Sequence, residues 1–130
     1  INYKGMVFDS TTIDNFWLYG ESKITQIQQI QFLKRFYFSE LPISKRTESV
    51  LKNIMFVEKS ADYTLSGKTG LSVKNELYNG WFVGYFEEKN KVYFFATNLE
   101  PVQKDFIKEK FYTTRIIATK AAFKSLKIFN

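Results

Sequence analysis

The sequence predicts an α/β fold of the α+β type, in which an antiparallel sheet is flanked by helices on both faces. Three runs rich in aromatic and β-branched residues predict strands at residues 63–69, 81–87 and 92–99. The polar loop 88–91 has hairpin length, so the last two strands should be antiparallel neighbours. Apolar residues occupy both alternating faces of these two strands, which is typical of a sheet covered on both sides.

Helical periodicity precedes and follows the strands. Thr25 and Gln28 have capping-box spacing, and the helix they open should run to about residue 38. Pro42 ends that region, and Ser44 should cap a second helix to about residue 55. A last helix is expected from around residue 106, or slightly later, to about residue 127. The expected inward faces are Ile27, Ile30, Leu33, Phe36 and Tyr37, then Val50, Leu51, Ile54 and Met55, and finally Ala118, Ala122 and Leu126.

The composition bounds the protein to one folded domain and excludes several kinds of chemistry. The chain has 130 residues, 45% of them hydrophobic, which is enough for a single modest core. Cys and His are both absent, which removes disulfides, thiolate and imidazole chemistry and most zinc sites. The sequence therefore predicts no metal and no cofactor. The net charge of +6 suggests an anionic partner or an acidic environment such as a cell wall, but an ordinary solvated surface is the favoured explanation because the Lys and Arg residues are dispersed.

The triplet Lys68-Thr69-Gly70, which closes the first predicted strand, suits an anionic ligand. A Lys ammonium attracts a carboxylate and can pass a proton if its surroundings lower its pKa. A Thr hydroxyl one step further can donate to the same anion. Gly has no side chain, so a ligand could lie against the backbone as an added strand would. For an isolated tripeptide the alternative is an ordinary turn, and only the surrounding motifs decide.

A second motif, Ser-x-x-Lys, occurs in this chain by chance. Ser49-Val50-Leu51-Lys52 fits Ser-x-x-Lys, the nucleophile motif of penicillin-interacting enzymes. This pattern arises by chance in Lys-rich chains, and here it lies inside an ordinary amphipathic helix. We therefore reject it as the nucleophile.

Several motifs occur in an order that resembles one known family. The runs are Asp14-Asn15-Phe16-Trp17-Leu18 with Lys23-Ile24, Gln31-Phe32-Leu33, Glu40-Leu41-Pro42 with Ser44-Lys45, Ser66-Gly67-Lys68-Thr69-Gly70 and Gly80-Trp81-Phe82-Val83-Gly84-Tyr85. Arg115 sits where that family keeps an Arg before its last helix. Together these motifs resemble the class D (OXA-type) serine β-lactamases and the sensor domains of BlaR/MecR-type β-lactam receptors. The resemblance implies a β-lactamase/penicillin-binding transpeptidase-like fold.

The resemblance also implies roles for the triplet. Lys68 would assist proton transfer as the catalytic residue of this chain, and with Thr69 it would bind the substrate. Gly70 would let the substrate approach the strand. The backbone N–H of Leu71 would form half of an oxyanion hole.

Two further site residues follow from the resemblance. Arg115 would hold the carboxylate common to β-lactams, a task that suits its planar two-pronged donor. The alternative for Arg115 is a surface residue at a helix start. Trp17 would pack against the carboxylated lysine that serves the family as general base, and a role as a plain core aromatic is compatible with that.

The chain departs from the family pattern at its beginning. Neither Ser-x-x-Lys nor Ser-x-Val has a counterpart upstream of Trp17, so residues 1–130 look like the C-terminal part of a single penicillin-recognising domain that lacks its N-terminal half. The family's Tyr-Gly-Asn would fall at Tyr3-Lys4-Gly5, where Lys4 and Gly5 break the motif. The strand at residues 92–99 should then lack a neighbour, and we expect the missing half or an intermolecular strand to pair with it.

Three functions are compatible with these observations. The first is β-lactam hydrolysis through serine acylation in the complete protein. The second is a sensor that stays acylated and signals. The third is a basic, aromatic nucleic-acid binder, which dispersed charges and aromatics on both strand faces disfavour. The expected partners are a β-lactam or peptidoglycan-like anion and the missing half of the domain, without nucleic acid, and the expected location is extracytoplasmic.

Overall fold

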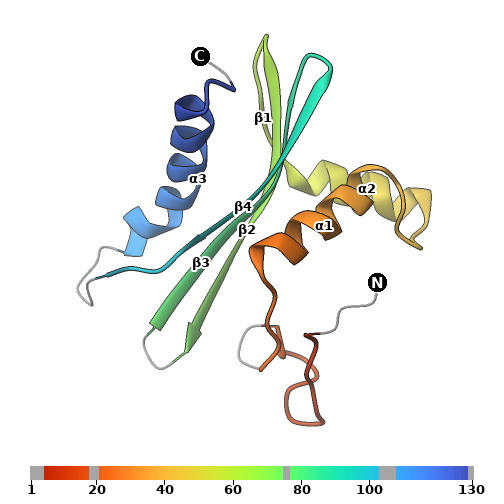
Figure 1. The fold of residues 1–130 in the computed structure, drawn as a ribbon. Helices are drawn as coiled ribbons and strands as arrows, with labels where there is room; N and C mark the ends of the chain where they lie inside the picture. Colours follow the sequence, from red (N-terminus) through yellow and green to blue (C-terminus); the bar gives the residue numbers. More distant parts are fainter. Residues whose placement is uncertain (1–4, 18–20, 75–76, 103–107, 129–130) are drawn as a thin grey trace.

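The computed structural model describes residues 5–17, 21–74, 77–102 and 108–128. In chain order the elements are α1 (Gln26–Tyr37), α2 (Lys45–Met55), β1 (Phe56–Lys59), β2 (Tyr63–Lys74), β3 (Leu77–Glu88), β4 (Lys91–Leu99) and α3 (Lys108–Ser125). Helix α3 covers one face of the sheet, and α1 and α2 lie on the other (Figure 1). The predicted α+β architecture is therefore confirmed.

The four strands form one antiparallel sheet in the order β1-β2-β3-β4. β2 and β3 pair continuously, from Tyr63 with Glu88 to Lys74 with Leu77. β1 is a strand that the sequence did not predict, because four residues directly after a helix are too few to show a period. β1 pairs with β2 only as far as Ser66. In the part of the chain that the structure describes, β2 beyond Ser66 and the outer side of β4 are open edges.

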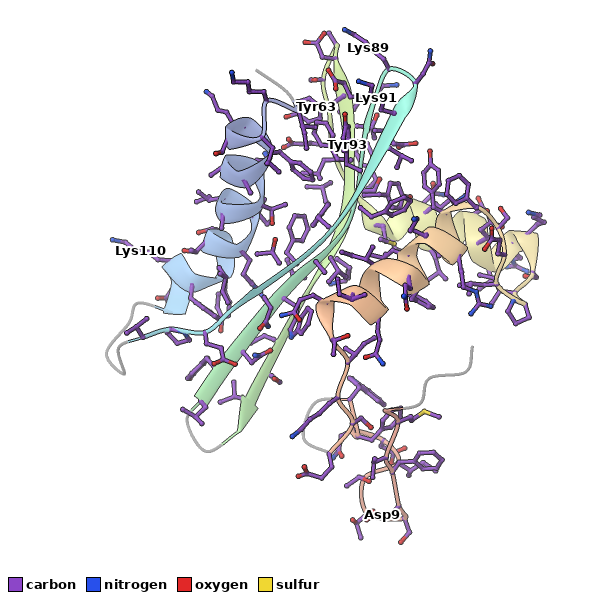
Figure 2. The ribbon with its side chains drawn as sticks, in the orientation of Figure 1. Asp9, Tyr63, Lys89, Lys91, Tyr93 and Lys110 are labelled. Atoms are coloured by element: carbon purple, nitrogen blue, oxygen red, sulfur yellow. The ribbon has the colours of Figure 1, made fainter. Side chains whose placement is uncertain are left out.

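Each face of the sheet has its own apolar core. On the α3 side the buried residues are Leu65, Phe82, Phe86, Phe95 and Phe123. Tyr63 and Tyr93 pack against this core toward the β3–β4 hairpin (Figure 2). On the opposite side Tyr85 packs with Phe36 and Leu41. Burying such side chains stabilises a fold by about 1.5–3 kcal/mol each. These aromatics are unavailable for stacking on bases, which counts against the nucleic-acid alternative.

Both predicted N-caps, Thr25 and Ser44, are confirmed, whereas the predicted start of the last helix near residue 106 lies outside the described residues. At α1 the Thr25 hydroxyl accepts from the backbone N–H of Gln28, and the Gln28 side chain accepts from the N–H of Thr25. At α2 the Ser44 hydroxyl accepts from the N–H of Thr47 at 3.0 Å. These bonds satisfy donors that would have no partner inside the helix. No helix in the described ranges is both long and apolar enough to cross a membrane.

The inward faces of the helices were predicted less well. In α2 the apolar residues Val50, Leu51 and Ile54 are exposed, and Glu48 is buried instead. In α1 Leu33 and Phe36 are buried as expected, whereas Ile27 is exposed. In α3 Ala122 is exposed, as is Leu126 directly after the helix, and the buried row is Phe111, Arg115, Thr119 and Phe123. Periodicity shows that a helix has an apolar stripe, but the neighbouring elements decide which stripe is covered.

Candidate functional site

The Lys68-Thr69-Gly70 triplet lies in the middle of β2, not at its end as predicted. The strand continues to Lys74 because β3 supplies a partner for every residue, including Trp81 for Gly70. The pairing of β1 with β2 ends at Ser66, so among the described strands the triplet pairs only with β3. It therefore lies on an open edge, to which an extended ligand could add main-chain hydrogen bonds.

The triplet presents its two polar side chains on different faces of the sheet. Register places Lys68 beside Val83, on the face that carries Tyr85, and places Thr69 beside Phe82 on the α3 face. The Lys68 side chain is exposed, and its Nζ donates to the carbonyl of Thr69 at 3.1 Å. A ligand along the edge would thus meet the ammonium from one side and the hydroxyl from the other.

Gly70 differs from the other glycines of the sheet. A Cβ at Gly67, Gly80 or Gly84 would come within 3.0 Å of neighbouring heavy atoms, so packing within the chain requires glycine there. A Cβ at Gly70 would meet only the Cβ of Trp81, at an ordinary 3.9 Å. The described part of the chain therefore leaves open space beside Gly70 that a ligand could use.

Arg115 is a buried residue inside α3, not a surface residue at a helix start. Its side chain is 4% exposed. Nη1 donates to the carbonyls of Gly70 and Trp81, and Nη2 donates to that of Tyr112 at 3.3 Å. The guanidinium carbon lies 5.9 Å from the ring centres of Phe111 and Tyr112. The last helix thereby brings a cation to the backbone of the triplet.

The charge of Arg115 is poorly compensated. Burial lowers its pKa from the ordinary 12.5. The hydrogen-bond acceptors found for it are carbonyl oxygens, and within the described ranges its Nε is buried without a hydrogen-bond partner. Other cations of the chain, such as Lys52 and Lys120, lie 2.7 Å from carboxylate oxygens. Among the described residues the charge of Arg115 meets carbonyl dipoles and aromatic rings, an environment that favours an anion at the edge of β2.

The two remaining predicted site residues are Leu71 and Trp17. Leu71 is half-buried opposite Gly80, next to the triplet. Trp17 belongs to the N-terminal segment, where it is 59% exposed and packs edge-on against Phe16. Lys68 and Arg115 reach β2 from opposite faces of the sheet. Tyr3 and Lys4 lie outside the described residues.

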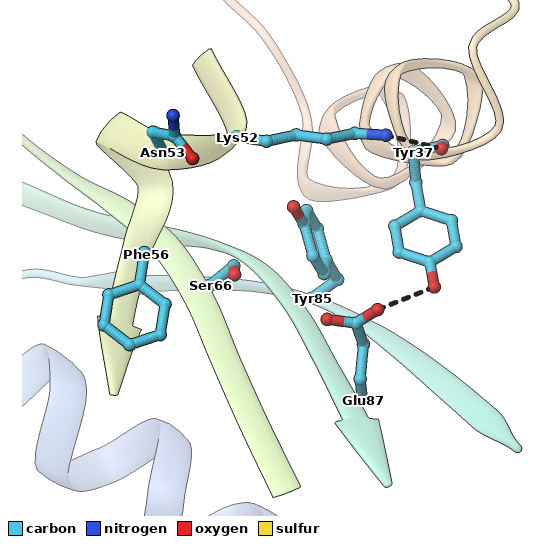
Figure 3. A pocket seen from close by; sticks show the side chains of 7 residues that line it. All are labelled: Tyr37, Lys52, Asn53, Phe56, Ser66, Tyr85 and Glu87. Carbon is cyan, nitrogen blue, oxygen red and sulfur yellow. Dashed lines mark hydrogen bonds between the residues drawn. The ribbon is translucent and has the colours of Figure 1, made fainter. Parts of the chain in front are cut away.

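The structure also contains a cavity that the sequence did not predict. It measures about 600 Å³ and is lined by Tyr37, Lys52, Asn53, Phe56, Ser66, Tyr85 and Glu87 (Figure 3). Its charged groups are already paired, since Tyr37 donates to Glu87 at 2.8 Å and Lys52 pairs with Glu48. The rejected Ser-x-x-Lys motif contributes Lys52 to this wall. Sequence carried no signal for the cavity, because its residues come from five separate elements.

Comparison with known proteins identifies relatives of this chain. Residues 6–122 match the Penicillin binding protein transpeptidase domain. Beta-lactamase OXA-48 of Klebsiella pneumoniae is 38% identical over 96 residues, which cover 74% of this chain and 36% of that protein. Regulatory protein BlaR1 of Bacillus licheniformis is 38% identical over 87 residues, which cover 66% of this chain and 14% of that protein.

Solved structures agree with these matches. The class D β-lactamase of Sebaldella termitidis superposes with a TM-score of 0.88 at 33% identity, covering 99% of this chain and 51% of that one. The C-terminal domain of the Bacillus licheniformis BlaR penicillin receptor gives 0.73 at 30% identity, covering 88% and 45%. The chain thus spans about half of the solved relatives and 36% of OXA-48. It belongs to the penicillin-binding protein transpeptidase domain family, and within that family it is similar to class D β-lactamases and BlaR-type sensor domains.

Proposed function

We propose that the protein carrying this chain binds β-lactams, is acylated by them at a serine and releases the acyl group by hydrolysis. The observation that supports this most strongly is the buried guanidinium of Arg115, bonded to the carbonyl of Gly70 on an open strand edge. A β-lactam carries a carboxylate, and so does a peptidoglycan-like peptide. Either could lie along the edge with its anion toward Arg115.

Each of the four residues 68–71 has a role in the proposed reaction. Thr69 shares the α3 face with Arg115 and donates to the ligand carboxylate. Lys68 approaches from the other face, attracts the anion and assists proton transfer at the acylated serine. The open space at Gly70 admits the ligand, and the N–H of Leu71 stabilises the oxyanion.

The nucleophile in this proposal comes from outside residues 1–130. Lys52 of the internal Ser-x-x-Lys pairs with Glu48 at 2.7 Å, and Ser49 is an exposed residue of α2. We propose that these residues are the C-terminal part of one domain whose other half supplies the serine. The open edge of β4 and the exposed apolar face of α2 (Val50, Leu51 and Ile54) support this, because such surfaces favour a covering partner. A strand of another molecule is the competing partner for β4.

Intact mass of the full-length protein after exposure to benzylpenicillin tests the proposal. We expect a mass increase of one penicillin per molecule. Arg115→Ala should slow acylation roughly ten- to hundredfold, since a hydrogen bond to a charged group contributes about 1.5–3 kcal/mol. Lys110→Ala removes an exposed cation of the same helix and should leave the rate unchanged. Absence of any adduct in the wild-type protein would refute the proposal.

A sensor that stays acylated is the second candidate. It is favoured by the similarity to BlaR1 and to the mecR1 protein of Staphylococcus aureus, which is 34% identical over 88 residues. The rate at which the adduct disappears separates the two. Loss within minutes indicates a hydrolase, whereas a lasting adduct indicates a sensor. In either case we propose an extracytoplasmic location, where β-lactams and peptidoglycan are met.

A further inference from the structure

We infer that Gly80 is a positioning residue for Arg115 and thereby sets the preference of the β2 edge for a carboxylate. This inference rests on the proposed function for its ligand and on packing for its geometry. Gly80 lies in β3, opposite Leu71 of β2 and Leu99 of β4. It therefore forms part of the surface over which the Arg115 side chain must pass to reach Gly70.

The packing around Gly80 leaves no room for a side chain. A Cβ at this position would lie 2.8 Å from Cδ of Arg115 and 2.9 Å from two ring carbons of Phe111. Both distances are well inside the ~3.5 Å at which carbon atoms come into contact. Phe111 is buried one helical turn before Arg115, so neither side chain can swing into solvent without leaving the core. An added methyl group would therefore displace the guanidinium from the carbonyls that hold it.

Two threonines, Thr119 and Thr97, fix the backbone of α3 at Arg115 relative to the sheet. The Thr119 hydroxyl donates to the carbonyl of Arg115 at 2.8 Å. Because its hydrogen is used there, the 2.6 Å contact between the hydroxyls of Thr119 and Thr97 has Thr97 as the donor. Thr97 lies in β4, so this pair fixes the turn of α3 that carries Arg115 onto the sheet. Gly80 then determines how closely the side chain can lie against β3.

Urea unfolding of the full-length protein tests the packing. Gly80→Ala should lower the unfolding midpoint in the wild type and equally in Arg115→Lys, because lysine keeps the Cδ atom. In Arg115→Ala the drop should be clearly smaller, leaving only the contact with Phe111. An equal drop in all three backgrounds would overturn the inference, since Gly80 would then act independently of residue 115.

Acylation by benzylpenicillin and by its methyl ester tests the consequence for ligand choice. Gly80→Ala should reduce the rate with the acid about tenfold more than the rate with the ester. In Arg115→Ala the same change should leave the acid-to-ester ratio as it was. Thr119→Val should lower this ratio, and Thr114→Val is its control, because Thr114 makes the same kind of bond to Lys110 on the exposed side of α3. Equal losses with acid and ester would overturn the inference.

These readouts separate the two proposals. A wild-type protein that reacts with neither compound refutes the proposed function. The urea experiment still decides whether Gly80 positions Arg115, because it measures packing without a ligand.

Discussion

The phenol of Tyr37 donates a hydrogen bond to the carboxylate of Glu87 over 2.8 Å and so ties α1 to β3 (Figure 3). The two residues are 50 positions apart in the chain. The same helix contributes Phe36 to the core on this face of the sheet, next to Tyr85. The contact therefore links the helical layer to the strand that pairs with the triplet.

Removal of this phenol should cost stability in a pH-dependent way. Burial, together with the bond to Glu87, raises the pKa of Tyr37 to about 12. Its contribution is complete below the unfolded value of about 10 and is lost as the pH rises toward 12. Tyr37→Phe should thus lower the free energy of unfolding by about 1 kcal/mol at neutral pH, and the difference should close between pH 10 and 12. Urea unfolding against pH measures it, with the exposed Tyr112→Phe as control.

The stabilising contribution of Glu48 should depend on pH in the direction opposite to that of Tyr37. The hydrogen bond from Lys52, followed by those from Ser39 and Lys45, lowers its pKa from 4.5 to about 2. A depressed carboxyl pKa stabilises the fold above 4.5, and this contribution is lost as the pH falls toward 2. Glu48→Gln should therefore lower the urea midpoint at pH 7 and converge with the wild type in acid. Glu40→Gln removes an exposed carboxylate nearby, and an equal effect there would argue against a specific role for Glu48.

Substitution of the sheet glycines by alanine should lower the free energy of unfolding by different amounts at different positions. A Cβ at Gly84 would lie 2.0 Å from the carbonyl oxygen of Ser66, which is backbone and cannot move aside. Gly84→Ala should lower the free energy of unfolding by about 3 kcal/mol or more. Gly70→Ala has room and should cost less than about 0.5 kcal/mol. Comparable losses in thermal or urea unfolding would show that Gly70, too, is required by packing.

The exposed apolar face of α2 gives a test of the missing half. Val50 is 48% exposed here, and Val102 is 100% exposed. If another segment covers α2 in the full-length protein, Val50→Glu buries an unpaired carboxylate and should destabilise the protein by more than about 2 kcal/mol. Val102→Glu should be neutral. Neutral behaviour of both variants would mean that the α2 face stays in water.

Prediction from sequence succeeded where the signal is local. The hairpin between β3 and β4, the capping box at Thr25 and the cap at Ser44 each depend on residues within a few positions of one another. Prediction failed where a distant partner decides. The burial of Glu48 depends on Ser39 in the α1–α2 connection, and the extension of β2 past Gly70 depends on pairing with β3.

The sequence by itself determined the order of the three helices and of strands β2, β3 and β4, and it indicated the family, because alternation, capping and short motifs are properties of neighbouring positions. Only the tertiary structure decided that Arg115 is buried, that it bonds to Gly70, and that Gly80 must lack a side chain for it to do so. The physical reason is that a helix and a strand 45 residues apart meet only once the core between them has packed.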